Sequence, residues 1–260
     1  MDHPWSSALV TGASSGIGAA IARRLGGAGV ELVLVARRAD RLEELATEIG
    51  SGSGREVEVL AADLADTDDR ARVASRLGDP DRPVDLLVNC AGLGASGLFA
   101  DGDLDRYHQV IDLNITALVD LSHAAVEPMV ARRRGWIMNI SSLGGHTPGP
   151  RFAVYSASKA FVTSFSESLH EEVRRSGVHV TAVCPGATRT KFADQAGIDD
   201  TTPDLLWQTA DQVADEALTA TAAGRAVRVT GGLNRATAAV TTVLPRSANR
   251  WLSAKVTERL

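Results

Sequence analysis

Cysteine is scarce in this chain, and its shortage excludes a fold held together by disulfides. Its 260 residues include two cysteines, Cys90 and Cys184, which are too few for a disulfide framework. Both lie in apolar stretches, so we interpret them as buried free thiols of a protein from the reducing cytoplasm. Clusters of Cys, His and Asp at metal-ligand spacing are missing too, so no metal site is expected.

A surplus of positive charge and long hydrophobic runs are also missing. Lys plus Arg number 27 against 32 Asp plus Glu, a formal net charge of −5, whereas nucleic-acid-binding proteins usually carry a basic surplus. No apolar stretch reaches the ~20 residues that a membrane span needs. The first apolar run, Ala8 to Val10, leads at once into a glycine loop and leaves no room for a signal peptide. We therefore expect a soluble cytoplasmic protein with no nucleic-acid partner and no membrane span.

Short β-rich runs alternate with longer helical segments along the chain. The β-rich runs are mostly continuous Val, Leu and Ile, which is typical of a parallel sheet covered on both faces. The predicted strands are Ala8–Val10, Glu31–Ala36, Glu56–Ala61, Asp85–Asn89, Trp136–Ile140, His179–Cys184 and Ala226–Thr230. The predicted helices are Ile17–Gly27, Ala39–Ile49, Asp66–Leu77, Asp103–Ala131 (two helices or a broken one), Ala153–Ser176 and Thr209–Ala223. This order predicts an α/β fold: a Rossmann-type doubly wound parallel sheet of about seven strands with helices on both faces.

A glycine-rich loop follows the first predicted strand and opens a helix. It reads TGASSGIG, from Thr11 to Gly18. Gly12 permits a tight turn, Gly16 lets the backbone approach a pyrophosphate, and Gly18 lets the helix pack against the sheet. The helix N-terminus directs free N–H groups at the phosphates. The residues expected to bind a dinucleotide here are Gly12, Ser14, Ser15, Gly16, Ile17 and Gly18.

The end of the second predicted strand indicates which dinucleotide is bound. A site specific for NAD places an acidic side chain there, on the ribose 2′-hydroxyl. This chain instead has Arg37 and Arg38, whose guanidinium groups can pair with a 2′-phosphate. Cations are mildly unfavourable at a helix start, so two of them need a reason. The expected cofactor is NADP(H).

The motifs together resemble those of the short-chain dehydrogenase/reductase family, in its short-form, NADP-preferring branch. The resemblance runs from Leu9 to about Thr230 and keeps the order of the family's motifs. These are TGASSGIG at Thr11–Gly18, Asp63-Leu64, NCAG at Asn89–Gly92, Asn114, Ser142 within NISS, YSASK at Tyr155–Lys159, and PGAT at Pro185–Thr188. One departure is Cys90, where the family usually has a second Asn; we expect its side chain to turn toward the core.

The resemblance implies further cofactor contacts. Asp63 and Leu64 would flank the adenine. Asn89, Ala91 and Gly92 would line the cofactor after the fourth strand. Pro185, Gly186 and Thr188 would hold the nicotinamide, with Thr188 bonding its carboxamide.

The proposed catalytic group is Asn114, Ser142, Tyr155 and Lys159. Tyr155 and Lys159 are one helical turn apart and share a helix face. A phenol has a pKa near ~10, and a lysine cation beside it, with the positively charged nicotinamide nearby, is expected to lower that pKa. Tyr155 can then act as the general acid/base, while Ser142 steadies the substrate oxygen. Asn114 is expected to bend its helix and hold a water that links Lys159 to solvent.

The predicted function is therefore hydride transfer between NADP(H) and a carbonyl or alcohol carbon of a hydrophobic substrate, with carbonyl reduction as the cellular direction. The alternative is a catalytically silent NADP(H)-binding regulator. The stretches Leu93–Phe99, Leu143–Phe152 and Arg189–Trp207 are expected to form the substrate side, the third as a lid. His146 is either a substrate contact or a plain loop residue.

One domain is predicted over 1–260, because the glycine-serine patch at 50–54 is interpreted as a turn. The basic tail, 231–260, extends past the last strand, and Pro245 breaks it in two. It is expected to cover the pocket or a subunit interface, and a peripheral membrane contact is the alternative. The resemblance also implies a homodimer or homotetramer, in which the helices over 112–131 and 153–176 pair between subunits.

Overall fold

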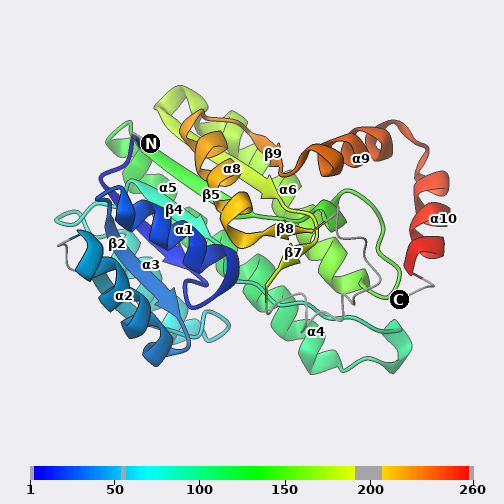
Figure 1. Ribbon diagram of the computed structural model, residues 1–260, viewed down its shortest axis with the longest axis horizontal. Coiled ribbons are helices and arrows are strands. Elements are labelled where there is room, and N and C mark those ends of the chain that lie inside the picture. The colour runs from blue at the N-terminus through cyan, green and yellow to red at the C-terminus, as the bar shows by residue number, and fades with distance from the viewer. Residues whose placement is uncertain (1–2, 54–56, 191–206, 258–260) are drawn as a thin grey trace.

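A computed structural model describes residues 3–53, 57–190 and 207–257 of the chain. Seven strands form one sheet in the order β3-β2-β1-β4-β5-β6-β9, and every neighbouring pair is parallel. They are β1 Ser7–Thr11, β2 Glu31–Ala36, β3 Val57–Ala61, β4 Leu86–Asn89, β5 Gly135–Ile140, β6 Val178–Cys184 and β9 Val227–Val229. The strand order changes direction between β1 and β4, so the predicted doubly wound fold is confirmed (Figure 1).

Helices cover both faces of the sheet (Figure 1). One face carries α1 (Gly16–Gly27), α2 (Ala39–Ser53) and α8 (Ala210–Ala222). The other carries α3 (Thr67–Leu77), α5 (Ala117–Ala131) and α6 (Ala153–Val173). The alternating β and α segments of the sequence therefore fold into three layers, as right-handed crossovers require.

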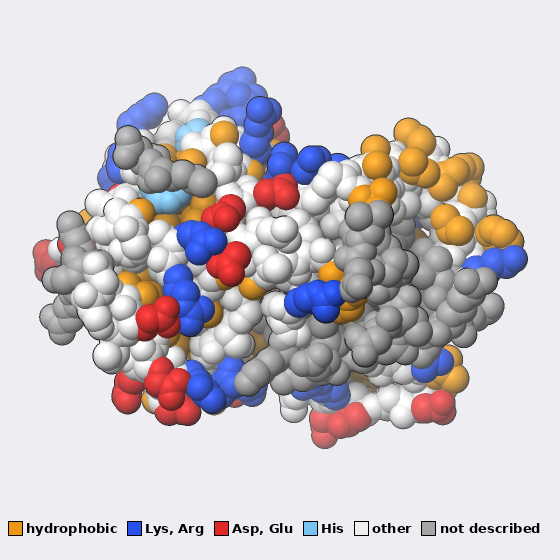
Figure 2. All heavy atoms as spheres, in the orientation of Figure 1, with side chains coloured by type: hydrophobic (Ala, Val, Ile, Leu, Met, Phe, Trp, Pro, Cys, Tyr) orange, Lys and Arg blue, Asp and Glu red, His pale blue; other side chains and the backbone are white. Residues whose placement is uncertain are grey.

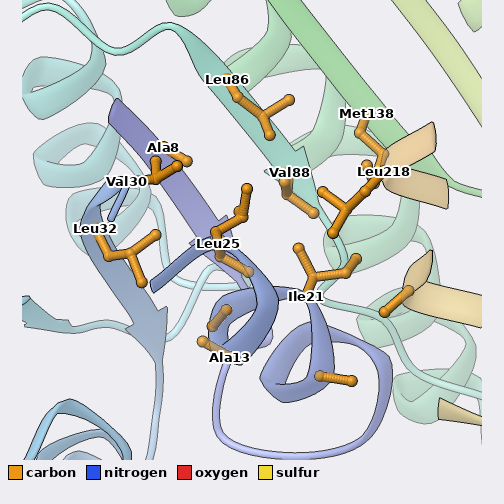
Figure 3. Close-up of a cluster of buried hydrophobic side chains, with 14 of the residues drawn as sticks. Ala8, Ala13, Ile21, Leu25, Val30, Leu32, Leu86, Val88, Met138 and Leu218 are labelled. Atoms are coloured by element: carbon orange, nitrogen blue, oxygen red, sulfur yellow. The ribbon is translucent and has the colours of Figure 1, made fainter. Parts of the chain in front are cut away.

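The core on the α1 side fixes the position of the glycine loop. Ile21 and Leu25 of α1 and Leu218 of α8 are almost fully buried against the sheet (Figure 3). Burial of a side chain of this size contributes about 1.5–3 kcal/mol. This packing holds the first turn of α1 at the carboxyl edge of β1.

The structure refines several predicted elements. The segment expected as a broken helix is α4 (Leu104–Ile111), a π-helical turn at Asp112–Thr116, and α5. Asp66 caps α3, as its side chain accepts hydrogen bonds from the Asp68 and Asp69 backbone N–H groups. The patch 50–54 is not simply a turn, because α2 continues through Ser53. Two short strands were not predicted, β7 (Thr188–Arg189) and β8 (Gln208–Thr209), which pair in parallel.

The basic tail forms two helices. Helix α9 spans Gly232–Val243 and α10 spans Arg246–Thr257, with Pro245 between them as expected. Both extend away from the sheet and its flanking helices (Figure 1). In the part of the chain that the structure describes, no helix is long and apolar enough to cross a bilayer.

Candidate active site

A cleft of about 810 Å³ follows the carboxyl ends of the parallel strands. Its wall is formed by residues that come directly after β1, β2, β4, β5 and β6. The sequence-predicted residues that line it are Gly12, Ser14, Ser15, Gly16, Ile17, Arg37, Arg38, Asp63, Leu64, Ala91, Gly92, Ser142, Tyr155, Lys159, Pro185, Gly186 and Thr188. The fold therefore brings nearly all of the proposed cofactor and catalytic positions to one cavity.

The glycine loop is packed too closely for side chains. Gly12 has φ +67°, and a Cβ there would lie 2.9 Å from the Ala91 backbone nitrogen. A Cβ on Gly18 would lie 2.5 Å from the Gly12 carbonyl oxygen. Thr11 locks the loop to the end of β4, because its Oγ1 accepts hydrogen bonds from the backbone N–H groups of Cys90 (2.9 Å) and Ala91 (3.0 Å). Gly18 itself does not line the cleft and serves the packing of α1.

The two arginines after β2 lie beside the glycine loop. Arg38 donates from Nη2 to the hydroxyls of Ser14 (3.0 Å) and Ser15 (3.3 Å). Arg37 lies 3.8 Å from the Asp63 carboxylate at the rim of the cleft. Both guanidinium groups are exposed, so they remain available to an anionic ligand in the cleft.

The end of β4 differs from expectation at two positions. Asn89 is buried, and its Nδ2 donates to Asn139 Oδ1 (2.9 Å) and Ser122 Oγ (3.1 Å). This corrects the expectation that Asn89 lines the cleft, since its amide faces the core. Cys90 packs against the core as expected, but it also lines the cleft. Burial raises the pKa of its thiol to about 12.

The four proposed catalytic residues come from three regions of the fold. Ser142 follows β5, where its Oγ accepts a hydrogen bond from the Gly144 backbone N–H (3.0 Å). Tyr155 and Lys159 lie on α6, with Lys159 Nζ 5.9 Å from the centre of the Tyr155 ring. Lys159 Nζ also donates to the Ile140 carbonyl oxygen (2.8 Å). Because Ser142 accepts from Gly144, it can use its own proton for a hydrogen bond on the cleft side, where it contacts Tyr155.

Asn114 lies in the π-helical turn and connects it to Leu93 and to Ser158 of α6. Its Oδ1 accepts from the Leu93 backbone N–H (2.8 Å), and its Nδ2 donates to the Leu93 carbonyl (3.0 Å) and Ser158 Oγ (3.0 Å). It does not line the cleft. A Cβ on Gly92 would lie 3.3 Å from Asn114 Oδ1 and 3.5 Å from Lys159 Nζ. Gly92 therefore lies next to both groups, and a side chain at this position would crowd them.

The motifs and the cleft agree with the comparison to known families. A family model described as short chain dehydrogenase matches residues 6–200. The chain belongs to the short-chain dehydrogenase/reductase family. It is 41% identical to sulfoacetaldehyde reductase 2 of Chromohalobacter salexigens over 209 residues, 75% of this chain and 81% of that protein.

Two solved structures of the family share the fold closely. The short-chain dehydrogenase from Sphingobium yanoikuyae, in complex with NADPH, is 37% identical with a TM-score of 0.82, over 92% of this chain and 96% of that one. The bulky-bulky ketone specific alcohol dehydrogenase from Comamonas testosteroni is 31% identical with a TM-score of 0.79, over 93% and 95% of the two chains. This short-chain dehydrogenase/reductase is accordingly an oxidoreductase.

The acid/base pair of this short-chain dehydrogenase/reductase has pKa values set mainly by burial. Burial raises the pKa of Tyr155 to about 12, against the opposing effect of a hydrogen bond with Ser142. This direction is opposite to the predicted lowering, which relied on the charges of Lys159 and of the nicotinamide, because burial of the phenol has the largest effect. Burial also lowers the pKa of Lys159 to about 8. Lys159 is therefore mostly charged at pH 7 and loses its charge as the pH rises through about 8.

We expect Lys159 to destabilise the folded protein, because its charged amine is buried. Lys159→Met should raise the free energy of unfolding by on the order of 1–3 kcal/mol at pH about 7, because a buried cation is removed. The folded-state pKa of about 8 lies below the ordinary 10.5. The destabilisation by the buried cation is therefore fully present below pH 8, decreases between pH 8 and 10.5, and is lost above pH 10.5. Urea unfolding at several pH values measures the difference.

Lys255→Met is the matched control, because Lys255 is exposed on α10. Its effect on unfolding should be small. A Lys159→Met protein that is no more stable than the parent at neutral pH would contradict the burial penalty.

Several cleft residues were missed by sequence reasoning. Ser141 donates to the Lys159 carbonyl (2.7 Å) and thereby ties β5 to α6. The residues of the tail helices that line the cleft are Thr237, Thr241, Leu252 and Ser253. No local motif marks them, since only the path of the tail brings them to the cleft. The tail was expected to cover the pocket or a subunit interface, but the sequence did not indicate which of its side chains would reach the cleft.

The expected substrate stretches contribute unequally. Leu93 lines the cleft, as do Leu143, Thr147, Pro148 and Phe152 from the loop after β5. His146 does not line it. The expected lid, Arg189–Trp207, lies outside the described residues over 191–206. No group of three or more His, Cys, Asp or Glu side chains within 3–53, 57–190 and 207–257 could hold a metal ion.

Proposed function

We propose that the cleft binds NADP(H) and that Tyr155 exchanges a proton with a carbonyl or alcohol oxygen beside it, mainly in carbonyl reduction. One observation carries this proposal: the glycine loop, the two arginines and the Ser142, Tyr155 and Lys159 side chains line a single cleft. The NADPH complex of the Sphingobium relative supports the cofactor. The regulator alternative gains no support, because the complete acid/base group is present and assembled.

The described residues fit this cofactor on structural grounds. A Cβ at Gly12 or Gly18 would collide with backbone, so glycine at these positions allows the tight turn that leads to the N-terminus of α1, where a pyrophosphate would bind. Arg37 and Arg38 would hold the 2′-phosphate, with Arg38 oriented by two serine hydroxyls. Asp63 and Leu64 would contact the adenine, and Pro185, Gly186 and Thr188 the nicotinamide.

The residues of the chain then supply the proton and the orientation. When bound, the nicotinamide supplies or accepts the hydride. Ser142 Oγ donates a hydrogen bond to the carbonyl oxygen and steadies the charge that develops on it. Tyr155 Oη gives that oxygen its proton, and charged Lys159 stabilises the phenolate that remains. Asn114 would hold the water through which Lys159 exchanges protons with solvent.

The cleft favours a hydrophobic carbonyl compound with few polar groups. Leu93, Leu143, Pro148, Phe152 and Leu252 supply apolar contacts at its substrate end. Relatives named as a sulfoacetaldehyde reductase and a ketone-specific alcohol dehydrogenase support a carbonyl substrate. A homodimer or homotetramer in the cytoplasm, built through the helices over 112–131 and 153–176, completes the proposal.

The test is NADPH and NADH oxidation against a panel of apolar ketones, aldehydes and 3-oxoacyl thioesters. Turnover with NADPH that exceeds turnover with NADH is the expected result. Tight NADPH binding without turnover on any member of the panel would contradict the reductase and favour the regulator. A preference for NADH would contradict the role given to the two arginines.

A further inference from the structure

Helix α9 exposes its three largest apolar side chains and buries one polar side chain. Asn234 and Ala238 are buried, and Thr241 lines the cleft at the next turn of the same stripe. Asn234 Nδ2 donates to the Thr230 carbonyl (3.0 Å) and fixes this orientation. The opposite side exposes Leu233 by 46%, Val240 by 55% and Val243 by 80%. A helix that packs only on its own domain usually buries its large apolar side chains and exposes its polar ones.

Helix α10 continues the apolar surface. Asn249 is buried, and its Nδ2 donates to the Thr241 carbonyl (2.7 Å), which ties α10 to α9. Trp251 and Leu252 are exposed by 60% and 44%. We call α9 and α10 together, 232–257, the C-terminal arm. Half of the large exposed hydrophobic side chains among the described residues belong to this arm, and Figure 2 shows apolar side chains gathered over it at the upper right.

The arm is also basic, although the protein as a whole is acidic. It contains Arg235, Arg246, Arg250 and Lys255 and no Asp or Glu, whereas the whole chain has a net charge of −5. Arg235 pairs with Glu216 of α8 (3.2 Å). Arg246 and Arg250 form no ion pair within the described residues. Lys255 Nζ lies 4.3 Å from the centre of the Trp251 ring.

We propose that the C-terminal arm docks on an anionic lipid bilayer. Exposed Leu, Val and Trp beside Arg and Lys is the composition of helices that lie in the membrane interface. The indole of Trp251 and the ammonium of Lys255 suit the boundary between acyl chains and headgroups. A second copy fits this surface less well, because a symmetric contact would bring the cations of both arms together.

The same arm borders the cleft. Thr237, Thr241, Leu252 and Ser253 line it, so Leu252 lies where the exposed apolar surface of α10 meets the cleft. Docking would therefore place the substrate end of the cleft at the lipid surface, where an apolar carbonyl compound dissolved in the bilayer can enter. This consequence rests on the proposed reductase function, whereas vesicle binding does not.

The experiment is flotation of the full chain with vesicles of phosphatidylcholine, alone or with phosphatidylglycerol at about 7:3. We expect flotation with the mixed vesicles and release by high salt. Val243→Ser/Trp251→Ser should lower the bound fraction by about tenfold or more, because the inserted apolar groups are removed. Leu98→Ser/Leu104→Ser is the matched control, since it removes two exposed hydrophobic side chains away from the arm.

A charge variant tests the proposal without altering the apolar face. Arg246→Glu/Arg250→Glu should abolish the preference for phosphatidylglycerol, whereas Arg174→Glu/Arg175→Glu, directly after α6, should leave it unchanged. Thermal unfolding checks that each variant is folded.

Failure of the full chain to float with the mixed vesicles at low salt would overturn the proposal. So would an equal loss in both control variants. If vesicles are not bound and Val243→Ser/Trp251→Ser dissociates an oligomer in light scattering, the face belongs to a second copy instead. Because flotation needs no turnover, its result stays readable even if the proposed reductase activity fails.

Discussion

Tyr155→Phe is expected to lower kcat for carbonyl reduction by about 10²–10⁴-fold, with little change in NADPH binding. The substitution removes the only proposed proton donor to the substrate oxygen and keeps the ring. Ser142 can still donate a hydrogen bond to that oxygen, which leaves a residual rate. Steady-state kinetics with the best ketone of the panel, together with NADPH titration by fluorescence, measures both quantities.

The matched control is Tyr107→Phe, since the chain has two tyrosines and Tyr107 stacks on Phe99 at 5.1 Å. Tyr107 does not line the cleft, so its substitution should leave kcat within about threefold of the parent. A Tyr155→Phe protein that keeps most of its turnover would show that another group supplies the proton.

Arg37→Ala/Arg38→Ala is expected to weaken NADPH binding by about one to two orders of magnitude. Both guanidinium groups face the place proposed for the 2′-phosphate, and Arg38 is already oriented by Ser14 and Ser15. The substitutions remove charge-assisted hydrogen bonds to the 2′-phosphate of NADPH. NADH has no phosphate at this position and forms no such hydrogen bonds. Binding of NADH should therefore change little, and the preference between the two cofactors should shrink or reverse.

Titration calorimetry with NADPH and NADH measures this change. Arg41→Ala is a suitable control, because Arg41 is exposed on α2, pairs with Glu44 and does not line the cleft. An equal loss of affinity for both cofactors would indicate damage to the loop and not loss of phosphate recognition.

Most of the sheet could be predicted because its strands are continuous Val, Leu and Ile runs buried on both faces. The position of the cofactor loop was also predictable, because the chain needs glycine at Gly12 and Gly18, where a Cβ would meet backbone, and these glycines mark the loop in the sequence. Strand ends are less predictable. Asn89 and Cys90 are adjacent, yet the Asn89 amide is held in the core by Asn139 and Ser122, which lie far away in sequence, whereas Cys90 lines the cleft.

The electrostatics of the site could not be predicted from spacing. The separation of Tyr155 and Lys159 places them on one helix face, but their pKa values depend on burial by segments from the whole chain. The outward apolar face of α9 was hidden for a related reason. A helical pattern shows which residues share a face, and only tertiary packing decides which face is turned inward.

The raised pKa values of the two thiols have a practical consequence for chemical labelling of the protein. Burial raises the pKa of Cys90 to about 12 and raises that of Cys184 as well, so hardly any thiolate exists at neutral pH. Maleimides and mild oxidants should therefore spare both native cysteines. A single cysteine introduced at an exposed site, such as Ser247 on α10, would then be the dominant target for a spectroscopic label. The protein accepts site-specific labelling without prior removal of its own thiols.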